Sequence, residues 1–288
     1  MRVENKMKLL FRLLISLVVV CLSSETKGQG KIINSDSISF TILYNDVPLN
    51  DSFIGDQGFS CLLESGEHSF LFDGGRIEDY LKRNTERLDI DYSKIEFIFI
   101  SHLHSDHIGG LPGIIEECGR PVLYLPFTFP KTQTARGRSY VAERLDFITQ
   151  YAADTIHIKH PVKLRDCFYS TGMMEEQTFE QALIINTTSG LIVITGCSHP
   201  GIIGIVKKAK ALLQREVCFI MGGFHLAIMD PRQVKEIACE LRNLTQFIAP
   251  CHCTGEMAQQ IFKEIFKEDY LEIKAGLRFK IPRRSGQL

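Results

Sequence analysis

The chain has 288 residues, of which 44% are hydrophobic, as in ordinary globular proteins. This length permits one large domain or two small ones. The formal net charge is −1, so the composition gives no electrostatic reason to expect a nucleic-acid partner.

The first 28 residues have the pattern of a secretory signal peptide. Basic side chains come first, at Arg2, Lys6, Lys8 and Arg12. An apolar run at 13–22 follows, and small or polar residues at 23–30 offer a cleavage site. Because the run is shorter than the about 20 residues of a membrane span, we expect residues 1–28 to be removed and the protein to be periplasmic or extracellular. A lipid anchor at Cys21, an uncleaved N-terminal anchor and a cytosolic core helix are the alternatives.

The nine cysteines are spread along the chain, mostly in apolar surroundings. Only Cys251 and Cys253 are close in sequence, and they flank His252. We therefore expect free buried thiols, even in an exported protein. For Cys251 and Cys253 a role as metal ligands stays open.

The first predicted elements after the signal are strands. Residues 37–46 are β-rich and end in a turn signal. Residues 58–64 and 68–73 predict a hairpin. A helix is predicted at about 77–84, where apolar residues recur on one face.

The next predicted strand, at 97–100, runs directly into a histidine-rich segment. Four candidate metal ligands follow it: His102, His104, Asp106 and His107. Side chains of extended backbone alternate between faces, so His102, His104 and Asp106 are expected to point the same way. Imidazole and carboxylate groups at this spacing suit a borderline divalent ion, most of all zinc, with manganese or iron as alternatives. A cluster of surface histidines without a metal is the competing interpretation.

The middle of the chain is less regular. A helix is predicted at 111–118 and a strand, bracketed by prolines, at 120–126. Residues 127–144 are basic, with Lys131, Arg136, Arg138 and Arg144. These side chains could hold an anionic group such as phosphate, but a solvated loop is the favoured interpretation. A helix at about 139–151 and strands within 155–170 follow.

The second half repeats one arrangement: an apolar strand, a histidine and a helix. Strands are predicted at 179–186, 190–199, 217–221 and 247–249. Helices are predicted at 202–214, 232–241 and 256–266. His199, His225 and His252 each lie at or just beyond the end of a strand. Since the loops at one edge of a sandwich converge, these histidines are expected to join those of the first half in one metal site.

The segment Ser-His-Leu-His-Ser-Asp-His-Ile-Gly-Gly, residues 101–110, resembles the second motif of the metallo-β-lactamase superfamily. The resemblance implies an α/β fold, a four-layer αββα sandwich with a one- or two-metal site at one edge, in a single domain over residues 29–288. The motifs Gly-Cys-Ser-His-Pro-Gly, Gly-Gly-Phe-His-Leu and His-Cys-Thr-Gly further resemble the 7,8-dihydropterin-6-yl-methyl-4-(β-D-ribofuranosyl)aminobenzene 5′-phosphate synthase-like group.

The resemblance also implies roles for the candidate ligands. The first metal position is expected to use His102, His104 and His199. The second is expected to use Asp106, His107 and His252, with His225 as a further candidate. Asp73, in the segment Phe-Asp-Gly-Gly, is expected to orient a ligand histidine through the free ring N–H. A loop aspartate that caps the next turn is the alternative.

One departure from the family pattern concerns the number of ions. Many two-metal members have a bridging aspartate between the third and last histidine motifs. Here that place reads Gly-Gly-Phe-His-Leu, and Asp230, five residues beyond His225, is not expected to reach the site. Whether one or two ions bind is left open.

The implied function is metal-dependent hydrolysis by a metal-bound hydroxide, since a bound ion lowers the pKa of water toward about 7. Asp106 would hold that water or the second ion, and His225, if it is no ligand, would donate to the developing oxyanion. The expected substrate is a small ester, lactone or phosphodiester, phosphorylated or not. A ribofuranosylaminobenzene 5′-phosphate synthase-like transferase is the alternative, and a non-catalytic metal-binding protein is a further one. We expect a small-molecule substrate, no nucleic acid and membrane contact only through the N-terminus, with the oligomeric state open.

Overall fold

The computed structural model describes residues 31–66, 68–127, 135–174 and 178–281. Ile32–Leu288 is one compact unit. The predicted signal peptide lies outside the described residues, and so do Lys131 and the side chains of Arg136 and Arg138. None of the helices that the structure describes has both the length and the apolar character needed to cross a bilayer.

One sheet has seven strands among the described residues, in the order β13-β1-β2-β3-β4-β5-β6. They are β1 (Ile38–Tyr44), β2 (Ser60–Ser65), β3 (His68–Phe72), β4 (Ile95–Phe99), β5 (Val122–Pro126), β6 (Asp154–Ile158) and β13 (Arg278–Phe279). β2 and β3 form the predicted hairpin, and β3 to β6 pair in parallel. Parallel neighbours need crossover connections, which here carry α2 (Glu78–Arg87), α3 (Ser105–Ile108) and α4 (Ala135–Gln150).

The second sheet has six strands among the described residues, in the order β12-β11-β10-β9-β8-β7. They are β7 (Val162–Arg165), β8 (Phe168–Ser170), β9 (Leu183–Thr187), β10 (Gly190–Thr195), β11 (Val217–Gly223) and β12 (Thr245–Cys251). β9 and β10 form the second predicted hairpin, whereas β10, β11 and β12 run parallel. Their crossovers are α5 (Ile202–Leu213) and α6 (Pro231–Arg242), and α7 (Glu256–Phe266) follows β12.

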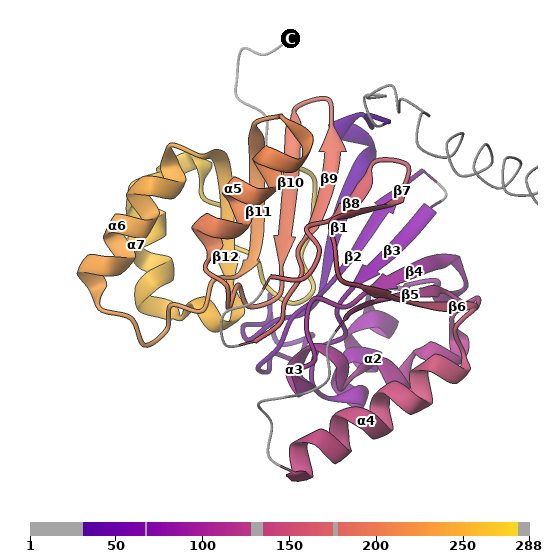
Figure 1. The fold of residues 1–288 in the computed structure, drawn as a ribbon. Helices are drawn as coiled ribbons and strands as arrows, with labels where there is room; N and C mark the ends of the chain where they lie inside the picture. Colours follow the sequence, from indigo (N-terminus) through magenta and orange to yellow (C-terminus); the bar gives the residue numbers. More distant parts are fainter. Residues whose placement is uncertain (1–30, 67, 128–134, 175–177, 282–288) are drawn as a thin grey trace, which may run out of the picture. The chain divides into compact units, whose positions relative to one another are not determined.

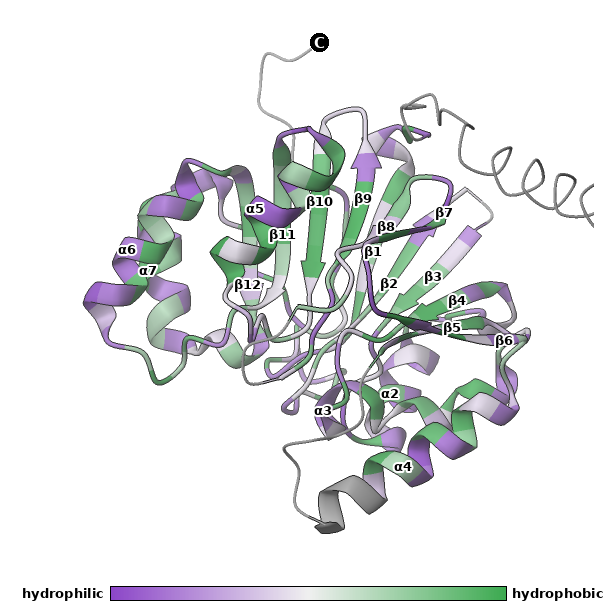
Figure 2. Ribbon diagram, in the orientation of Figure 1, coloured by the Kyte–Doolittle hydropathy of each residue, from purple (hydrophilic) through white to green (hydrophobic). Residues whose placement is uncertain are grey.

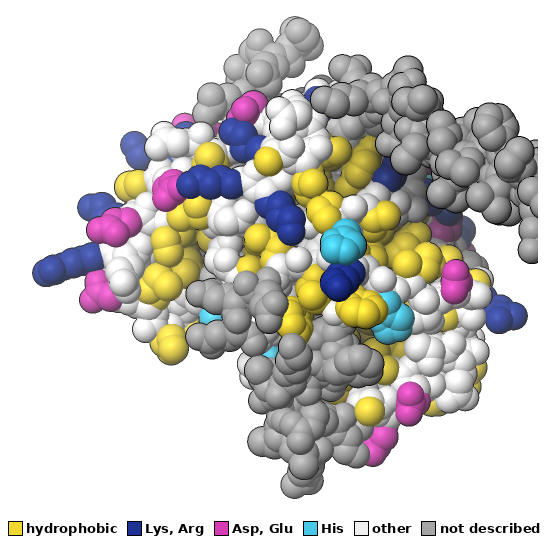
Figure 3. All heavy atoms as spheres, in the orientation of Figure 1, with side chains coloured by type: hydrophobic (Ala, Val, Ile, Leu, Met, Phe, Trp, Pro, Cys, Tyr) yellow, Lys and Arg dark blue, Asp and Glu magenta, His cyan; other side chains and the backbone are white. Residues whose placement is uncertain are grey.

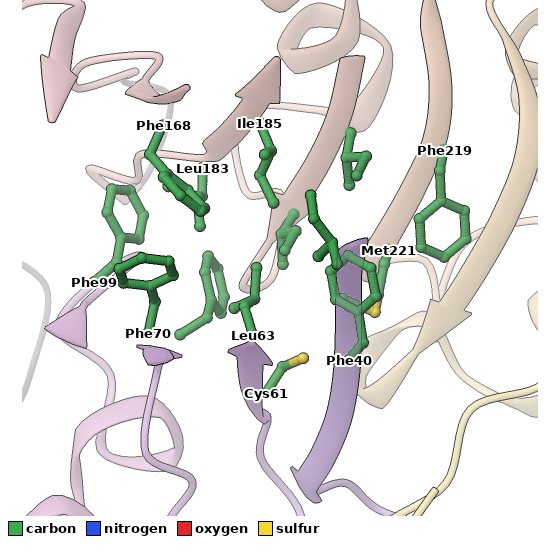
Figure 4. Close-up of a cluster of buried hydrophobic side chains, with 14 of the residues drawn as sticks. Phe40, Cys61, Leu63, Phe70, Phe99, Phe168, Leu183, Ile185, Phe219 and Met221 are labelled. Carbon is green, nitrogen blue, oxygen red and sulfur yellow. The ribbon is translucent and has the colours of Figure 1, made fainter. Parts of the chain in front are cut away.

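The inner faces of the two sheets meet in a core of aliphatic and aromatic side chains, part of which is drawn in Figure 4. Phe70 of β3 stacks on Phe97 of β4, with ring centroids 4.4 Å apart. Phe70 also packs edge-to-face with Phe168 of β8, in the opposite sheet, with ring centroids 4.5 Å apart. Each such aromatic pair adds about 0.5–1.5 kcal/mol beyond the burial of its apolar area. The core thus joins the sheets into a sandwich.

Helices cover the outer faces of both sheets. α2 and α4 contribute Leu81, Val141 and Ile148 to a cluster with the outer side chains of the first sheet. α5, α6 and α7 contribute a second cluster against the other sheet. Figure 1 shows α5, α6 and α7 on one side of the sandwich and α2 and α4 on the other, and Figure 2 shows the apolar stretches of these helices. The predicted four-layer αββα architecture is therefore confirmed.

One predicted helix is wrong. Residues 111–118 form two separate 3-10 turns, Leu111–Gly113 and Ile115–Glu117. Pro112 lacks an N–H, Gly113 has a low helix propensity, and Ile114 leaves the helical region with φ −128°. The other predicted helices and strands are present with shifted ends, and β12 extends well beyond the predicted 247–249.

Candidate metal centre

The candidate ligands lie on loops that follow four strands. The loop after β4 carries His102 and His104 and leads into α3, which carries Asp106 and His107. The loops after β10, β11 and β12 carry the remaining candidates, His199, His225 and His252. Because parallel strands end at the same edge of a sheet, these loops converge. In Figure 1 this edge is the lower one, where α3 is labelled.

The first predicted group comes together in the structure. His102, His104 and His199 each offer a ring nitrogen, and these nitrogens all lie within 4.8 Å of one another. His102 Nε2 and His104 Nδ1 are 3.1 Å apart. Burial and the neighbouring His199 together lower the pKa of His104 to about 4. The pKa of His102 is also lowered by burial and by adjacent histidines. Both imidazoles are therefore neutral at pH 7, which is the form that binds a metal.

Asp106 belongs to a second group, with His107 and His252, whose ligand atoms also lie within 4.8 Å of one another. The prediction that Asp106 shares a face with His102 and His104 is wrong, because extended backbone ends at His104 and α3 begins at Ser105. The helical turn directs the Asp106 carboxylate to His252 Nε2, at 3.4 Å. Burial raises the pKa of Asp106, but His107 and His252 outweigh it and hold that pKa well below its ordinary value.

Asp73 lies where the sequence predicted, against a candidate ligand. Its side chain is fully buried, and Oδ2 accepts a hydrogen bond from His107 Nδ1 at 2.7 Å. The Ser101 hydroxyl donates to the same oxygen at 2.7 Å and lies 2.9 Å from His102 Nδ1. Burial raises the pKa of Asp73, and the contacts with His107 and Ser101 act against that rise. One carboxylate thus orients His107 directly and His102 through a hydroxyl group, leaving Nε2 of each ring toward the centre.

Two further carboxylates have the same role and were missed in the sequence. Glu180 Oε2 accepts from His199 Nδ1 at 2.9 Å, and Asp46 Oδ1 lies 2.8 Å from His252 Nδ1. Burial raises the pKa of Glu180, but His199 and backbone N–H groups outweigh it and lower that pKa. The sequence feature that could have indicated Glu180 is its charge at the start of a predicted apolar strand. Nothing in the sequence indicated Asp46.

His225 is placed differently from the prediction. Its side chain is exposed, and its ring centroid lies 4.6 Å from that of His199. A ring nitrogen of His225 lies within 4.8 Å of the ligand atoms of Cys197 and His199. His225 therefore lies beside the first group and not with Asp106. A hydrogen bond with Cys253 raises the pKa of His225.

Of the remaining candidates, Asp230 and Cys251 lie outside the metal centre, whereas Cys253 lies within it. Asp230 accepts from the N–H of Arg232 at 2.8 Å and caps α6, as expected for a residue outside the site. Cys251 belongs to the core between the sheets. Cys253, by contrast, lies within 4.8 Å of ligand atoms of His252 and Cys197.

The donor set fits a divalent ion. His252 Nε2 is a buried ring nitrogen without a hydrogen bond, one of three such side-chain atoms among the described residues. It faces the Asp106 carboxylate and the other candidate donors, where an ion would supply the missing partner. Imidazole ligands held by carboxylates through their other ring nitrogen are typical of transition-metal sites.

Comparisons with known proteins show what this chain is similar to. Residues 57–119 match the family model described as anti-Pycsar protein Apyc1. The 7,8-dihydropterin-6-methyl-4-(beta-D-ribofuranosyl)-aminobenzene-5'-phosphate synthase of Methanocaldococcus jannaschii is 29% identical over 287 residues, which cover 86% of this chain and 97% of that protein. The ribonuclease Z of Treponema pallidum is 46% identical over 56 residues, 19% of this chain and 17% of the relative.

Two solved structures resemble the whole sandwich. A metal-dependent hydrolase of the beta-lactamase superfamily superposes with a TM-score of 0.67 and 26% identity, covering 85% of this chain and 100% of its own. The short form of human tRNase Z superposes with a TM-score of 0.56 and 15% identity, with the same coverage. The chain is therefore a protein of the metallo-β-lactamase fold, and it is similar over most of its length to the dihydropterin ribofuranosylaminobenzene phosphate synthase.

Proposed function

We propose that this protein is a metal-dependent hydrolase that binds zinc and cleaves a small ester, lactone or phosphodiester. The observation that carries the proposal is the adjacency of two ligand groups at one edge of the sandwich. One consists of His102, His104 and His199, and the other of Asp106, His107 and His252. Imidazole ligands favour zinc over magnesium or calcium, and two groups provide for two ions.

Different residues of the chain would have separate roles in the reaction. A bound ion supplies a Lewis acid, which lowers the pKa of water and polarises a carbonyl or phosphoryl oxygen. Asp106, whose depressed pKa keeps it ionised, would accept a hydrogen bond from the attacking water and orient it. The exposed His225 ring, beside His199, would donate to the oxygen on which charge develops.

A small molecule, and no polyanion, is the proposed substrate. Lysine, arginine and acidic side chains are interspersed over the face drawn in Figure 3. Arg144, a candidate for binding an anionic group, donates to Glu78 Oε1 at 3.0 Å and lies 3.9 Å from the Tyr140 ring centroid. These contacts already engage its guanidinium, which favours the interpretation of this side chain as structural.

A second candidate function is a transferase acting on a phosphoribosyl compound. It rests on the similarity to the synthase of Methanocaldococcus jannaschii, which extends over 86% of this chain and 97% of the relative. The same ligand groups would serve either reaction. Each reaction takes place at one carbon or phosphorus centre, and each needs either an activated oxygen or a stabilised anion there.

Turnover and metal content together test these proposals. The purified protein, loaded with zinc, would be assayed on a nitrophenyl ester, a lactone, a bis-nitrophenyl phosphodiester and a phosphoribosyl compound. We expect hydrolysis of at least one of the first three, a loss of more than about 100-fold in His104→Ala, and lower zinc content in that variant. His157→Ala, which changes an exposed strand histidine, is the matched control and should resemble the parent.

The other outcomes separate the alternatives. Turnover of the phosphoribosyl compound alone would favour the transferase. Bound zinc without any turnover would favour a non-catalytic metal-binding protein. Full activity of His104→Ala would refute the metal-dependent mechanism.

We also propose that the protein is exported, on the strength of the basic and apolar pattern in residues 1–28. Intact-mass measurement of the protein from the periplasm or medium should give a chain that begins near residue 29. A cytoplasmic chain that keeps residues 1–28 would refute export.

A further inference from the structure

Cys197 has an unusual place in the candidate metal centre. It lies on the loop after β10, where its backbone N–H donates to Glu180 Oε1 at 2.9 Å. Its side chain is buried, and Sγ lies 3.2 Å from His107 Nε2. That nitrogen is the one that His107 turns to the centre, since its Nδ1 is held by Asp73. The sulfur therefore lies beside the place of an ion that His107 would bind.

The Cys197 sulfur also lies near both ligand groups at once. It forms close sets of donors with His102 and His107, with His199 and His225, and with His252 and Cys253, each within 4.8 Å. His102 and His199 belong to the first group, whereas His107 and His252 belong to the second. The sulfur therefore lies between the two ligand groups, where it could bind an ion held by either of them.

A second observation points to a ligand at the same place. His252 is only 4% exposed, and its Nε2 makes no hydrogen bond. A ligand nitrogen of His252 lies within 4.8 Å of the sulfurs of Cys197 and Cys253. A buried ring nitrogen without a hydrogen bond costs about 1–3 kcal/mol. His252 Nε2 lies 3.4 Å from the Asp106 carboxylate without such a bond, and an ion between it and the thiol would supply the missing partner.

The backbone at Gly223 has no room for a side chain. The segment Gly-Gly-Phe-His, residues 222–225, at the end of β11, carries no carboxylate. A Cβ on Gly223 would lie 2.5 Å from the Gly196 carbonyl oxygen and 2.6 Å from Cys253 Sγ. The backbone of Gly196 and the Cys253 sulfur therefore exclude a side chain at that position.

We propose that Cys197 would supply a thiolate ligand to the metal centre, from a place between the two ligand groups. The inference rests on the metal centre proposed above and specifies its ligands. A thiolate makes the donor set softer, so it should favour zinc, cobalt or iron(II) and disfavour magnesium and manganese. Binding of an ion would displace the thiol proton to solvent, as for other thiolate ligands.

Cobalt(II) substitution tests the proposal by a readout other than activity. The full-length protein would be stripped with a chelator, titrated with cobalt(II) and followed by absorption. Visible d–d bands report that the metal is bound, and a near-ultraviolet sulfur-to-cobalt band reports a thiolate ligand. We expect both in the parent, and we expect Cys197→Ala to lose the sulfur band while it keeps the d–d bands. Cys251→Ala, which changes a core thiol two residues from Cys253, is the matched control and should keep both.

Each contrary result has its own meaning. A parent with d–d bands and no sulfur band overturns the thiolate and leaves the metal centre in place. A parent that binds no cobalt overturns both. A sulfur band that survives in Cys197→Ala and disappears in Cys253→Ala assigns the ligand to Cys253 and overturns the role of Cys197.

A further measurement tests the proposal without relying on the folding of Cys197→Ala. X-ray absorption at the zinc edge of the Cys253→Ala variant should show a sulfur neighbour at about 2.3 Å, the usual zinc–thiolate distance. A first shell of nitrogen and oxygen alone in that variant would overturn the proposal.

Discussion

Glu180→Gln should weaken both the fold and the metal centre, although glutamine has almost the same shape. Glu180 is 1% exposed, and its carboxylate accepts four hydrogen bonds. Oε1 accepts from the backbone N–H groups of Cys197 and Ser198, and Oε2 accepts from the N–H and Nδ1 of His199. An amide has one acceptor oxygen, so two of the four bonds are lost and an NH₂ group faces two donors.

The size of the effect follows from those two bonds. A hydrogen bond to a charged group contributes about 1.5–3 kcal/mol, so the loss is about 3–6 kcal/mol in the free energy of unfolding. Because His199 also loses its orienting partner, metal affinity should fall by about 10–100-fold. Urea unfolding of the chelator-treated protein measures the first effect, and competition with a chromophoric chelator measures the second. Glu216→Gln, at an exposed ion pair with Lys210, should change stability by less than about 1 kcal/mol.

Acidification provides a further check on the same residue. The pKa of Glu180 in the folded protein lies below its ordinary value of 4.5. Its contribution to stability is therefore complete above pH 4.5 and is lost as the pH falls through the folded pKa. The chelator-treated parent should lose more stability than Glu180→Gln over that range. Equal acid sensitivity of the two proteins, or a Glu180→Gln variant as stable as Glu216→Gln, would refute the reasoning.

Three other predictions concern the metal, an orienting carboxylate and the core. Removing the metal with a chelator should lower the free energy of unfolding by about 2.7 kcal/mol relative to protein in metal at 100 times its Kd, and an unchanged melting curve would contradict this. Asp73→Asn should reduce metal affinity by about 10–100-fold through His107, as measured by chelator competition, and unaltered affinity would show that the contact is not needed. Phe70→Ala should cost about 3–5 kcal/mol in urea unfolding, whereas Ile228→Ala, at a side chain 97% exposed, should stay within about 0.5 kcal/mol of the parent.

The sequence was most informative where local patterns decide the structure. Apolar strands followed directly by histidines predicted that the candidate ligands meet at one edge of the sandwich. The periodic pattern of apolar side chains placed the strands correctly. The orientation of Asp106 was not predictable from the strand period, because α3 starts one residue earlier and changes that period. The turns at 111–118 were mistaken for a helix because apolar spacing outweighed the proline and glycine in the prediction.

The orienting carboxylates show a different limit. Asp46 and His252 are 206 positions apart in the chain, so no local pattern connects them. Glu180 and His199 are 19 apart and lie on opposite sides of a hairpin, so their contact depends on how β9 and β10 bring the two loops together. Asp73 could be anticipated only through a resemblance to a family.

The three histidines of the first group come from both halves of the sandwich. His102 and His104 follow a strand of one sheet, and His199 follows a strand of the other. A cation held by all three would cross-link the sheets, much as a disulfide cross-links two segments of a chain. Separation of the sheets at that end would break this link, so bound zinc should exchange with isotopically labelled zinc faster in urea concentrations below the unfolding transition than in buffer.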